Sequence, residues 1–257
     1  VSSDFPRYRA DLVRLIHGDY NPKGPGFKEE VVGSAVSGEY TGRRQSYPKG
    51  SYVRVTKLPH RRSFETVSIQ ARIYPTTPTK GVQGLVTSWV GDGTGGFGLF
   101  IDERGALAMA LRDASGTTEW VSTGRQLRAA TWYLVLGSYR SSGRKVSLRQ
   151  VPVSSWPADE TMAIVERTVS VGEVRVKDPI LIAAYWSRDE NGERVATGHF
   201  NGKIDRPRLF SRALTRREAD GFNQGISASR LKAGLIADWD FSRSVGTDKV
   251  VDASGHG

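Results

Sequence analysis

The sequence predicts an all-β fold, an antiparallel β-sandwich or jelly roll with one short helix. About a dozen short segments carry alternating apolar and polar residues, as half-buried strands do. The 29 glycines and 11 prolines fall largely at turn-like positions between these segments. A single segment carries a helix start signal. The 257 residues, 38% of them hydrophobic, suffice for one large all-β domain or two small ones.

Strands are expected in order along the chain. In 66–73 the apolar residues occupy odd positions and the polar ones even positions, which predicts one dry and one wet face. The segments 106–111 and 145–151 alternate in the same way. The segment 132–139 is apolar on both faces, so we expect a central strand that is covered on both sides. Turn signals separate the strands, at 91–96, 102–105, 113–116, 141–144 and 189–192.

The helix is expected near 215–222. Thr215 and Glu218 have the spacing of a capping box, in which each side chain bonds the backbone N–H of the other. Ala219 and Phe222 would then face the sheet, and Gly221 or Gly225 would end the helix. A last strand is expected at 235–241.

The absence of cysteine excludes disulfides and thiolate chemistry and agrees with a cytoplasmic protein. The net charge of +10 and pI near 9.9 suit an acidic partner. The arginines are dispersed, however, which favours a solvated basic surface over a polyanion site. No nucleic-acid-binding signature, membrane-spanning stretch or secretion leader is present in the sequence, so neither nucleic acid nor membrane is an expected partner.

Four segments, at 63–77, 95–111, 131–153 and 199–222, together resemble laminin-G-like, concanavalin A-type β-sandwiches, over roughly residues 60–225. In that family a strand with the pattern F-x-G-x-I-D-x-x-R-x-[FY]-x-R-A-L leads into a short helix. The matching residues are Phe200, Gly202, Ile204, Asp205, Arg208, Phe210, Arg212, Ala213 and Leu214. Their expected roles are structural, with Asp205 and Arg208 pairing or capping a turn. Pro207 departs from the pattern and predicts a strand that is at an edge or bulged.

A second resemblance covers the two ends of the chain. Residues 12–32, 40–53 and 234–257 are similar to the start of the large subunit of bacterial N,N-dimethylformamidases, which are amidohydrolases. The resemblance implies a cytoplasmic, non-catalytic domain for assembly or active-site shielding. It also implies a small partner subunit, an oligomer, and iron held by tyrosine and glutamate in a later region.

The expected organisation is therefore 1–59 leading into the sandwich, 60–225 as its core, and 226–257 as a linker and last strand that continues into a further domain. No catalytic, cofactor-binding or metal-binding residue is assigned to this chain.

Two pairs of titratable residues were weighed as catalytic candidates. His17 and Asp19 have the residue types of a base and its orienting carboxylate, but no nucleophile accompanies them, so we expect a histidine at a strand end that bonds its own loop. Asp238 and Asp240 share a face of a predicted strand, as paired carboxylates of a glycosidase would. Because the fuller glycosidase pattern is missing, we expect them to face solvent or bond loop amides. The isolated histidines predict no zinc site, and the turns are too poor in acids for a strong calcium signal.

A carbohydrate-binding module is the alternative function, because aromatic faces stack on sugar rings. Trp89 and Trp132 lie in apolar strands and are expected in the core. The candidate exposed platform is Trp120, Trp156 and Trp186.

Overall fold

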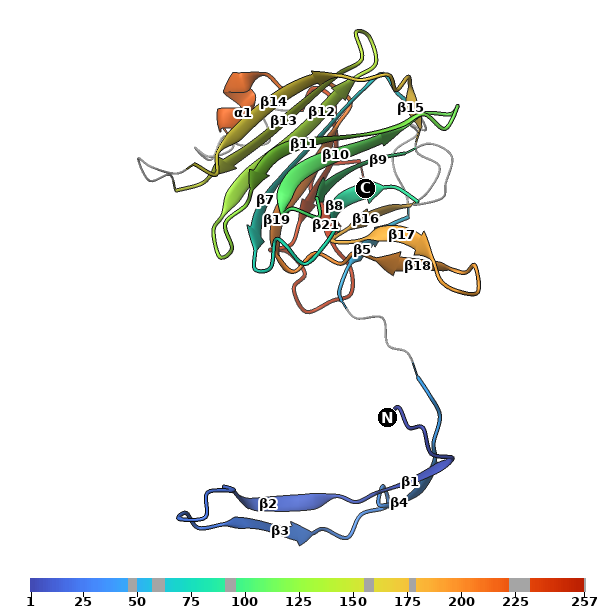
Figure 1. The fold of residues 1–257 in the computed structure, drawn as a ribbon, viewed down its shortest axis with the longest axis vertical. Coiled ribbons are helices and arrows are strands. Elements are labelled where there is room, and N and C mark those ends of the chain that lie inside the picture. Colours follow the sequence, from blue (N-terminus) through green and yellow to red (C-terminus); the bar gives the residue numbers. More distant parts are fainter. Residues whose placement is uncertain are drawn as a thin grey trace. The chain divides into compact units, whose positions relative to one another are not determined.

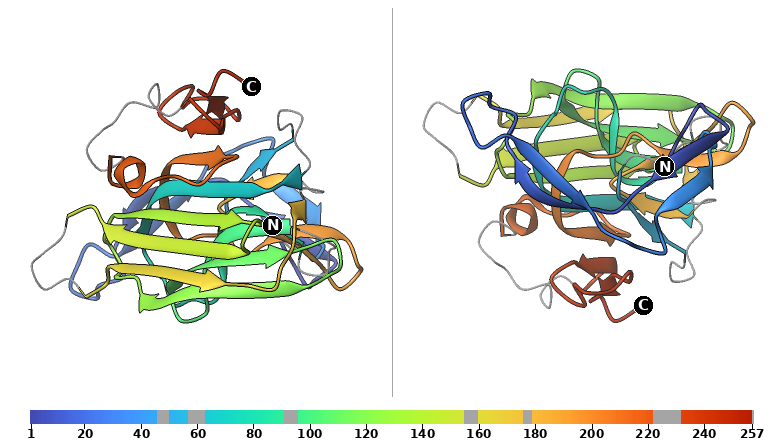
Figure 2. Two further views of the ribbon diagram at one scale, coloured as in Figure 1. Left: turned by 90° about the horizontal axis from the view of Figure 1, so that it is seen from above. Right: turned by 90° about the horizontal axis from the view of Figure 1, so that it is seen from below.

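The computed structural model describes residues 1–45, 50–56, 63–90, 96–154, 160–175, 179–221 and 232–256. They form two compact units, Val1–Lys49 and Gly50–Gly257. The larger unit is a β-sandwich, as predicted (Figures 1 and 2). Strands from both sides of the predicted core at 60–225, at 53–55 and 235–240, belong to its two main sheets.

Two antiparallel sheets of six and seven strands form the sandwich (Figure 1). In order across the first sheet the strands are β11 (Thr118–Gln126), β10 (Ala106–Arg112), β9 (Gly96–Ile101), β8 (Gln83–Ser88), β16 (Ile180–Ile182) and β5 (Val53–Val55). Across the second they are β14 (Ala163–Thr168), β13 (Lys145–Pro152), β12 (Tyr133–Arg140), β7 (Thr66–Pro75), β19 (Gly202–Phe210), β20 (Leu235–Asp240) and β21 (Val251–Asp252). Short pairs are β6 (Ser63–Phe64) with β15 (Val174–Arg175) and β17 (Tyr185–Arg188) with β18 (Arg194–Thr197).

The core lies between the two sheets and contains the apolar faces that the alternation predicted. The odd positions of β7, from Val67 to Ile73, are fully buried there. They face the apolar residues of β9 and β10, among them Leu99 and Met109. Strand β12 is buried on both faces, which confirms its predicted central place.

The predicted wet face of β7 was wrong, because Ser68 and Gln70 are buried. The Ser68 hydroxyl lies 2.7 Å from the Ser138 hydroxyl and donates to the carbonyl of Arg212. The side-chain oxygen of Gln70 accepts a hydrogen bond from Arg208. The outer face of β7 is therefore covered at Ser68 by the chain that follows β19, and these polar residues are paired internally instead of hydrated.

The helix α1 (Arg216–Gly221) begins with the predicted capping box. The Glu218 carboxylate accepts from the Thr215 N–H at 2.8 Å, and the Glu218 N–H donates to the Thr215 hydroxyl at 3.2 Å. Arg212 also donates twice to that carboxylate, at 2.6 and 2.9 Å. Ala219 is buried as expected. The predicted contacts of Phe222 and a helix end at Gly225 lie outside the described residues.

The smaller unit is an elongated arrangement of two-stranded ribbons. Strand β1 (Arg7–Ala10) pairs with β4 (Gly38–Thr41), and β2 (Val13–Gly18) pairs with β3 (Phe27–Val31). No residue within the described 1–45 is buried. The carboxylate of Asp19 accepts from the backbone N–H of Asn21 at 2.7 Å, and His17 lies on β2 opposite Lys28.

Candidate functional site

The motif strand β19 is interrupted by a bulge at Pro207. Strand β19 lies between β7 and β20, so it is not at an edge. Its register to β7 shifts between Asp205 and Arg208, and Arg206 adopts a left-handed φ of 48°. Since proline has no N–H to donate, the bulge lets it sit in an inner strand without breaking a ladder hydrogen bond. Of the two predicted explanations for Pro207, an edge strand or a bulge, the structure confirms the bulge.

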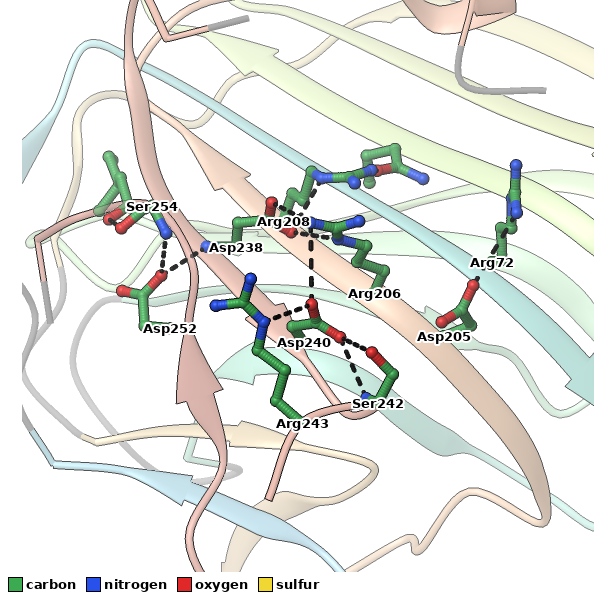
Figure 3. A network of polar contacts seen from close by, with 12 residues as sticks. Arg72, Asp205, Arg206, Arg208, Asp238, Asp240, Ser242, Arg243, Asp252 and Ser254 are labelled. Carbon is green, nitrogen blue, oxygen red and sulfur yellow. Dashed lines mark hydrogen bonds and ion pairs between the residues drawn. The ribbon is translucent and has the colours of Figure 1, made fainter. Parts of the chain in front are cut away.

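The bulge directs two arginines at one buried carboxylate (Figure 3). Asp238 on β20 is 0% exposed. It accepts from Nε and Nη2 of Arg206 at 3.2 and 3.3 Å and from Nε of Arg208 at 3.0 Å. Arg208 also donates to Gln70 at 2.9 Å. Burial lowers the pKa of the Arg208 guanidinium, and the charge of Asp238 opposes that shift.

Asp240 extends the network toward the surface (Figure 3). It accepts from the hydroxyl and the N–H of Ser242 at 2.6 and 3.0 Å, and Arg206 and Arg243 lie 3.9 and 3.5 Å away. These interactions, the Ser242 hydroxyl bond foremost, hold the pKa of Asp240 below its ordinary value. An ionised carboxylate that is already paired is a poor general acid, which needs a raised pKa.

The prediction for Asp238 was wrong, and that for Asp240 is confirmed. Asp238 does not face solvent or a loop amide but forms buried ion pairs, whereas Asp240 does bond a loop amide. Asp205 does not pair with Arg208, because the bulge turns Arg208 toward β20; its partner is Arg72, at 3.9 Å. Reasoning from sequence missed Arg206, although the Arg-Pro step at the irregular position was a usable signal.

The other motif residues have packing roles. Ile204 packs against the core between the sheets. Leu209 belongs to that core, whereas Phe210 and Leu214 belong to a separate cluster with Leu134. At Gly202 an added Cβ would lie 2.2 Å from the carbonyl oxygen of Tyr74 and 2.6 Å from the ring of Phe200, so β19 and β7 approach closely only because this residue is glycine.

A cluster of aromatic residues on the six-stranded sheet is separate from the main core, which lies between the two sheets. Trp120 on β11 is 45% exposed, and its ring centroid lies 4.8 Å from that of Phe100 and 5.7 Å from that of Trp89. The guanidinium of Arg112 lies 4.8 Å from the Trp89 ring. The cluster leaves the Trp120 indole partly exposed to solvent over an apolar base.

The three-tryptophan platform does not form as predicted. Trp186 is buried, donates to the carbonyl of Pro179 at 3.0 Å, and has the guanidiniums of Arg54 and Arg194 at 5.7 Å from its ring. Trp156 lies outside the described residues. Trp89 is buried as expected. Trp132 is only partly buried, beside Tyr74, so its predicted place in the core was wrong.

Cavities open on the described part of the larger unit. One, of about 540 Å³, lies between the outer faces of β12–β14 and α1. Its lining includes Arg140, Lys145 and Arg149, of which Arg149 pairs with Asp220 at 2.5 Å. Another, of about 510 Å³, is lined largely by apolar residues and backbone around 50–53, 182–183 and 200–204.

Metal binding has no support within the described residues, where no three His, Cys, Asp or Glu side chains gather closely enough to hold an ion. The hydroxyls of two core tyrosines are also engaged: that of Tyr133 donates to the Thr161 hydroxyl, and that of Tyr139 lies 2.6 and 2.7 Å from the carbonyl oxygens of Val171 and Gly172. An iron site does not fit these residues. In the described part of the chain no helix has the length and hydropathy of a membrane span.

Comparison with known proteins gives two kinds of similarity. No family model matches the chain. The chain is 38% identical over 271 residues to the N,N-dimethylformamidase beta subunit of Paracoccus aminophilus and 33% identical over 270 residues to that of an Alcaligenes species. Each alignment covers 97% of this chain but 34% of the relative, so the chain spans about a third of their length.

Two solved structures share the fold. A candidate carbohydrate-binding protein from Bacteroides ovatus has a TM-score of 0.58 and 16% identity, covering 90% of this chain and 63% of that one. A heptameric SAP-like pentraxin from Limulus polyphemus has a TM-score of 0.53 and 13% identity, covering 82% of this chain and 89% of that one. The chain thus shares the β-sandwich fold of these structures, and its similarity along nearly all its length to part of the N,N-dimethylformamidase beta subunits supports the family that its end segments indicate.

Proposed function

We propose that this chain is a non-catalytic β-sandwich domain of an N,N-dimethylformamidase-type amidohydrolase, whose parent reaction hydrolyses N,N-dimethylformamide to dimethylamine and formate. The observation that carries the proposal is the alignment over 97% of the chain, which includes the N-terminal unit as well as the sandwich. The domain supports assembly of the enzyme or shields the entry to its active site. We place this domain at the N-terminal end of the parent enzyme's large subunit, and the parent enzyme in the cytoplasm.

The state of the acidic side chains supports a structural role. Glu218 is held by Arg212, and its pKa falls from 4.5 to about 2. Asp238 and Asp240 are likewise engaged by arginines on the bulge. Amide hydrolysis needs an activated water and a group that polarises the carbonyl. In this proposal both come from iron in the remaining two thirds of the parent, which also meets a small subunit.

A domain exchange tests the proposal. The aligned third of the Paracoccus aminophilus subunit is replaced by residues 1–257, and the chimera is expressed with its small subunit. We expect iron binding and release of dimethylamine by the chimera, and neither by residues 1–257 alone after incubation with ferrous iron. Stoichiometric iron with turnover in the isolated chain would show that the active site lies here. A folded, assembled chimera without activity would show that this domain is not an equivalent supporting part.

Carbohydrate binding is the second candidate, favoured by the exposed indole of Trp120 on its aromatic base. Stacking on a sugar ring would need one face of the Trp120 indole to be accessible. We expect no specific glycan to bind residues 1–257 on an array. A hit that Trp120→Ala abolishes and Met162→Ala, at a similarly exposed apolar side chain, preserves would establish the binding module instead.

A further inference from the structure

The ribbon of β2 and β3 in the N-terminal unit has one apolar face. Val13 lies opposite Val31 in the register, and Leu15 lies two residues along the same face of β2. Phe27 shares the parity of Val31 on β3, and its ring stacks on that of Tyr20 at 4.9 Å. Glu29, opposite Leu15, is the one charged residue in this row.

The opposite face of the ribbon is charged. Arg14 lies opposite Glu30, and beyond a register shift His17 lies opposite Lys28. The opposite charges of Arg14 and Glu30 stabilise the strand pair modestly, and water solvates the other polar groups of this face. The ribbon therefore alternates apolar and polar residues, as does a strand pair whose apolar face packs on another layer. Its apolar face is nevertheless exposed, with Leu15 at 60% and Val31 at 68%.

An isolated two-stranded hairpin is marginally stable in water, and it becomes stable when its apolar face packs against another layer. Within the described part of the N-terminal unit, no side chain is buried, so this unit provides no such layer for itself. A contiguous exposed apolar row on a strand pair is a mark of an interaction surface.

The size of the face limits its occupant. Six residues of β2 at about 3.3 Å each, across two strands, give a face of roughly 200 Å². A stable interface buries about 800 Å² on each partner. Two copies of the chain that met only through these faces would therefore form a weak dimer. The face suits one part of a larger contact, such as a ribbon that lies along a much bigger body.

We propose that the apolar face of the β2–β3 ribbon docks on the part of the parent polypeptide that lies outside residues 1–257. The inference rests on the proposed function, because the relatives are about three times as long as the aligned region, which is 34% of their length. That remainder supplies a body large enough to receive the ribbon. The charged face then stays in water, and the ribbon ties this domain to the rest of the enzyme.

Hydrogen exchange followed by mass spectrometry tests the docking. Peptides from 13–31 are compared between residues 1–257 alone and the chimera described above, with the oligomeric state of both measured by light scattering. We expect amide exchange in these peptides to be slower in the chimera by about tenfold or more. Activity is measured separately, so failed docking in an active chimera refutes this inference without touching the proposed function.

Each other outcome overturns the docking. Protection in the isolated monomer would mean that the ribbon packs on its own sandwich. Protection that appears with a concentration-dependent dimer would make a second copy the occupant. Fast exchange in both proteins would leave the face uncovered. As a matched pair, Leu15→Gln should speed exchange in the chimera, whereas Arg14→Gln on the charged face should leave it unchanged.

Discussion

Replacing Asp238 by Asn tests whether the ion pairs at the bulge hold β20 on the sandwich. The substitution keeps the size of the side chain and removes its charge. Arg206 has a side chain that is 41% exposed and can turn toward water, whereas the Arg208 side chain is 8% exposed and cannot. The loss therefore falls mainly on Arg208, a buried charge that loses the carboxylate 3.0 Å from its Nε.

The magnitude follows from that burial. Removing one partner of a buried ion pair typically costs about 3–5 kcal/mol. Asn retains a carbonyl oxygen that can accept one arginine hydrogen bond, so we expect Asp238→Asn to lower the free energy of unfolding by about 3 kcal/mol. Domains of this kind have total stabilities of about 5–15 kcal/mol, so the change is large.

Urea unfolding of residues 1–257, followed by tryptophan fluorescence, measures the difference. The matched control is Arg243→Ala in the same network. Arg243 is 62% exposed and lies 3.5 Å from Asp240, so this control should cost less than about 1 kcal/mol. If Asp238→Asn also costs less than about 1 kcal/mol, the buried pair does not hold the strand, and the account of the bulge is wrong.

Two further changes test the helix cap and the close strand approach. The pKa of Glu218 is lowered from 4.5 to about 2 by Arg212, so its stabilisation is present above 4.5 and is lost as the pH falls through that window. Glu218→Gln should therefore be less stable than the natural chain at about pH 6, with a gap in urea midpoints that closes toward about pH 2; a constant gap would contradict the ion pair. Gly202→Ala should destabilise the sandwich by about 1–3 kcal/mol, since its Cβ would meet the Tyr74 carbonyl. Gly246→Ala, where a Cβ would meet nothing within 4 Å, should be nearly neutral in thermal unfolding.

The sequence predicted those elements whose residues repeat with a regular period. The core face of β7 follows from alternation alone, and the capping box of α1 follows from Thr215 and Glu218. It could not predict which outer faces become covered, because that depends on segments far along the chain. From the sequence, Ser68 is predicted to face solvent, but in the structure its hydroxyl bonds the carbonyl of Arg212. Likewise, Trp186 is predicted from the sequence to be exposed, but in the structure Arg54 lies beside its ring.

The order of strands in the seven-stranded sheet has a consequence during synthesis. Strand β7 pairs with β19, which follows it by about 140 residues, so at about 5–20 residues per second β7 leaves the ribosome roughly 7–28 s before that partner. Until then its edge toward β19 is open, and an unpaired apolar edge invites association with other chains. We therefore expect codons that slow translation between β12 and β19 to increase aggregation of the newly made protein.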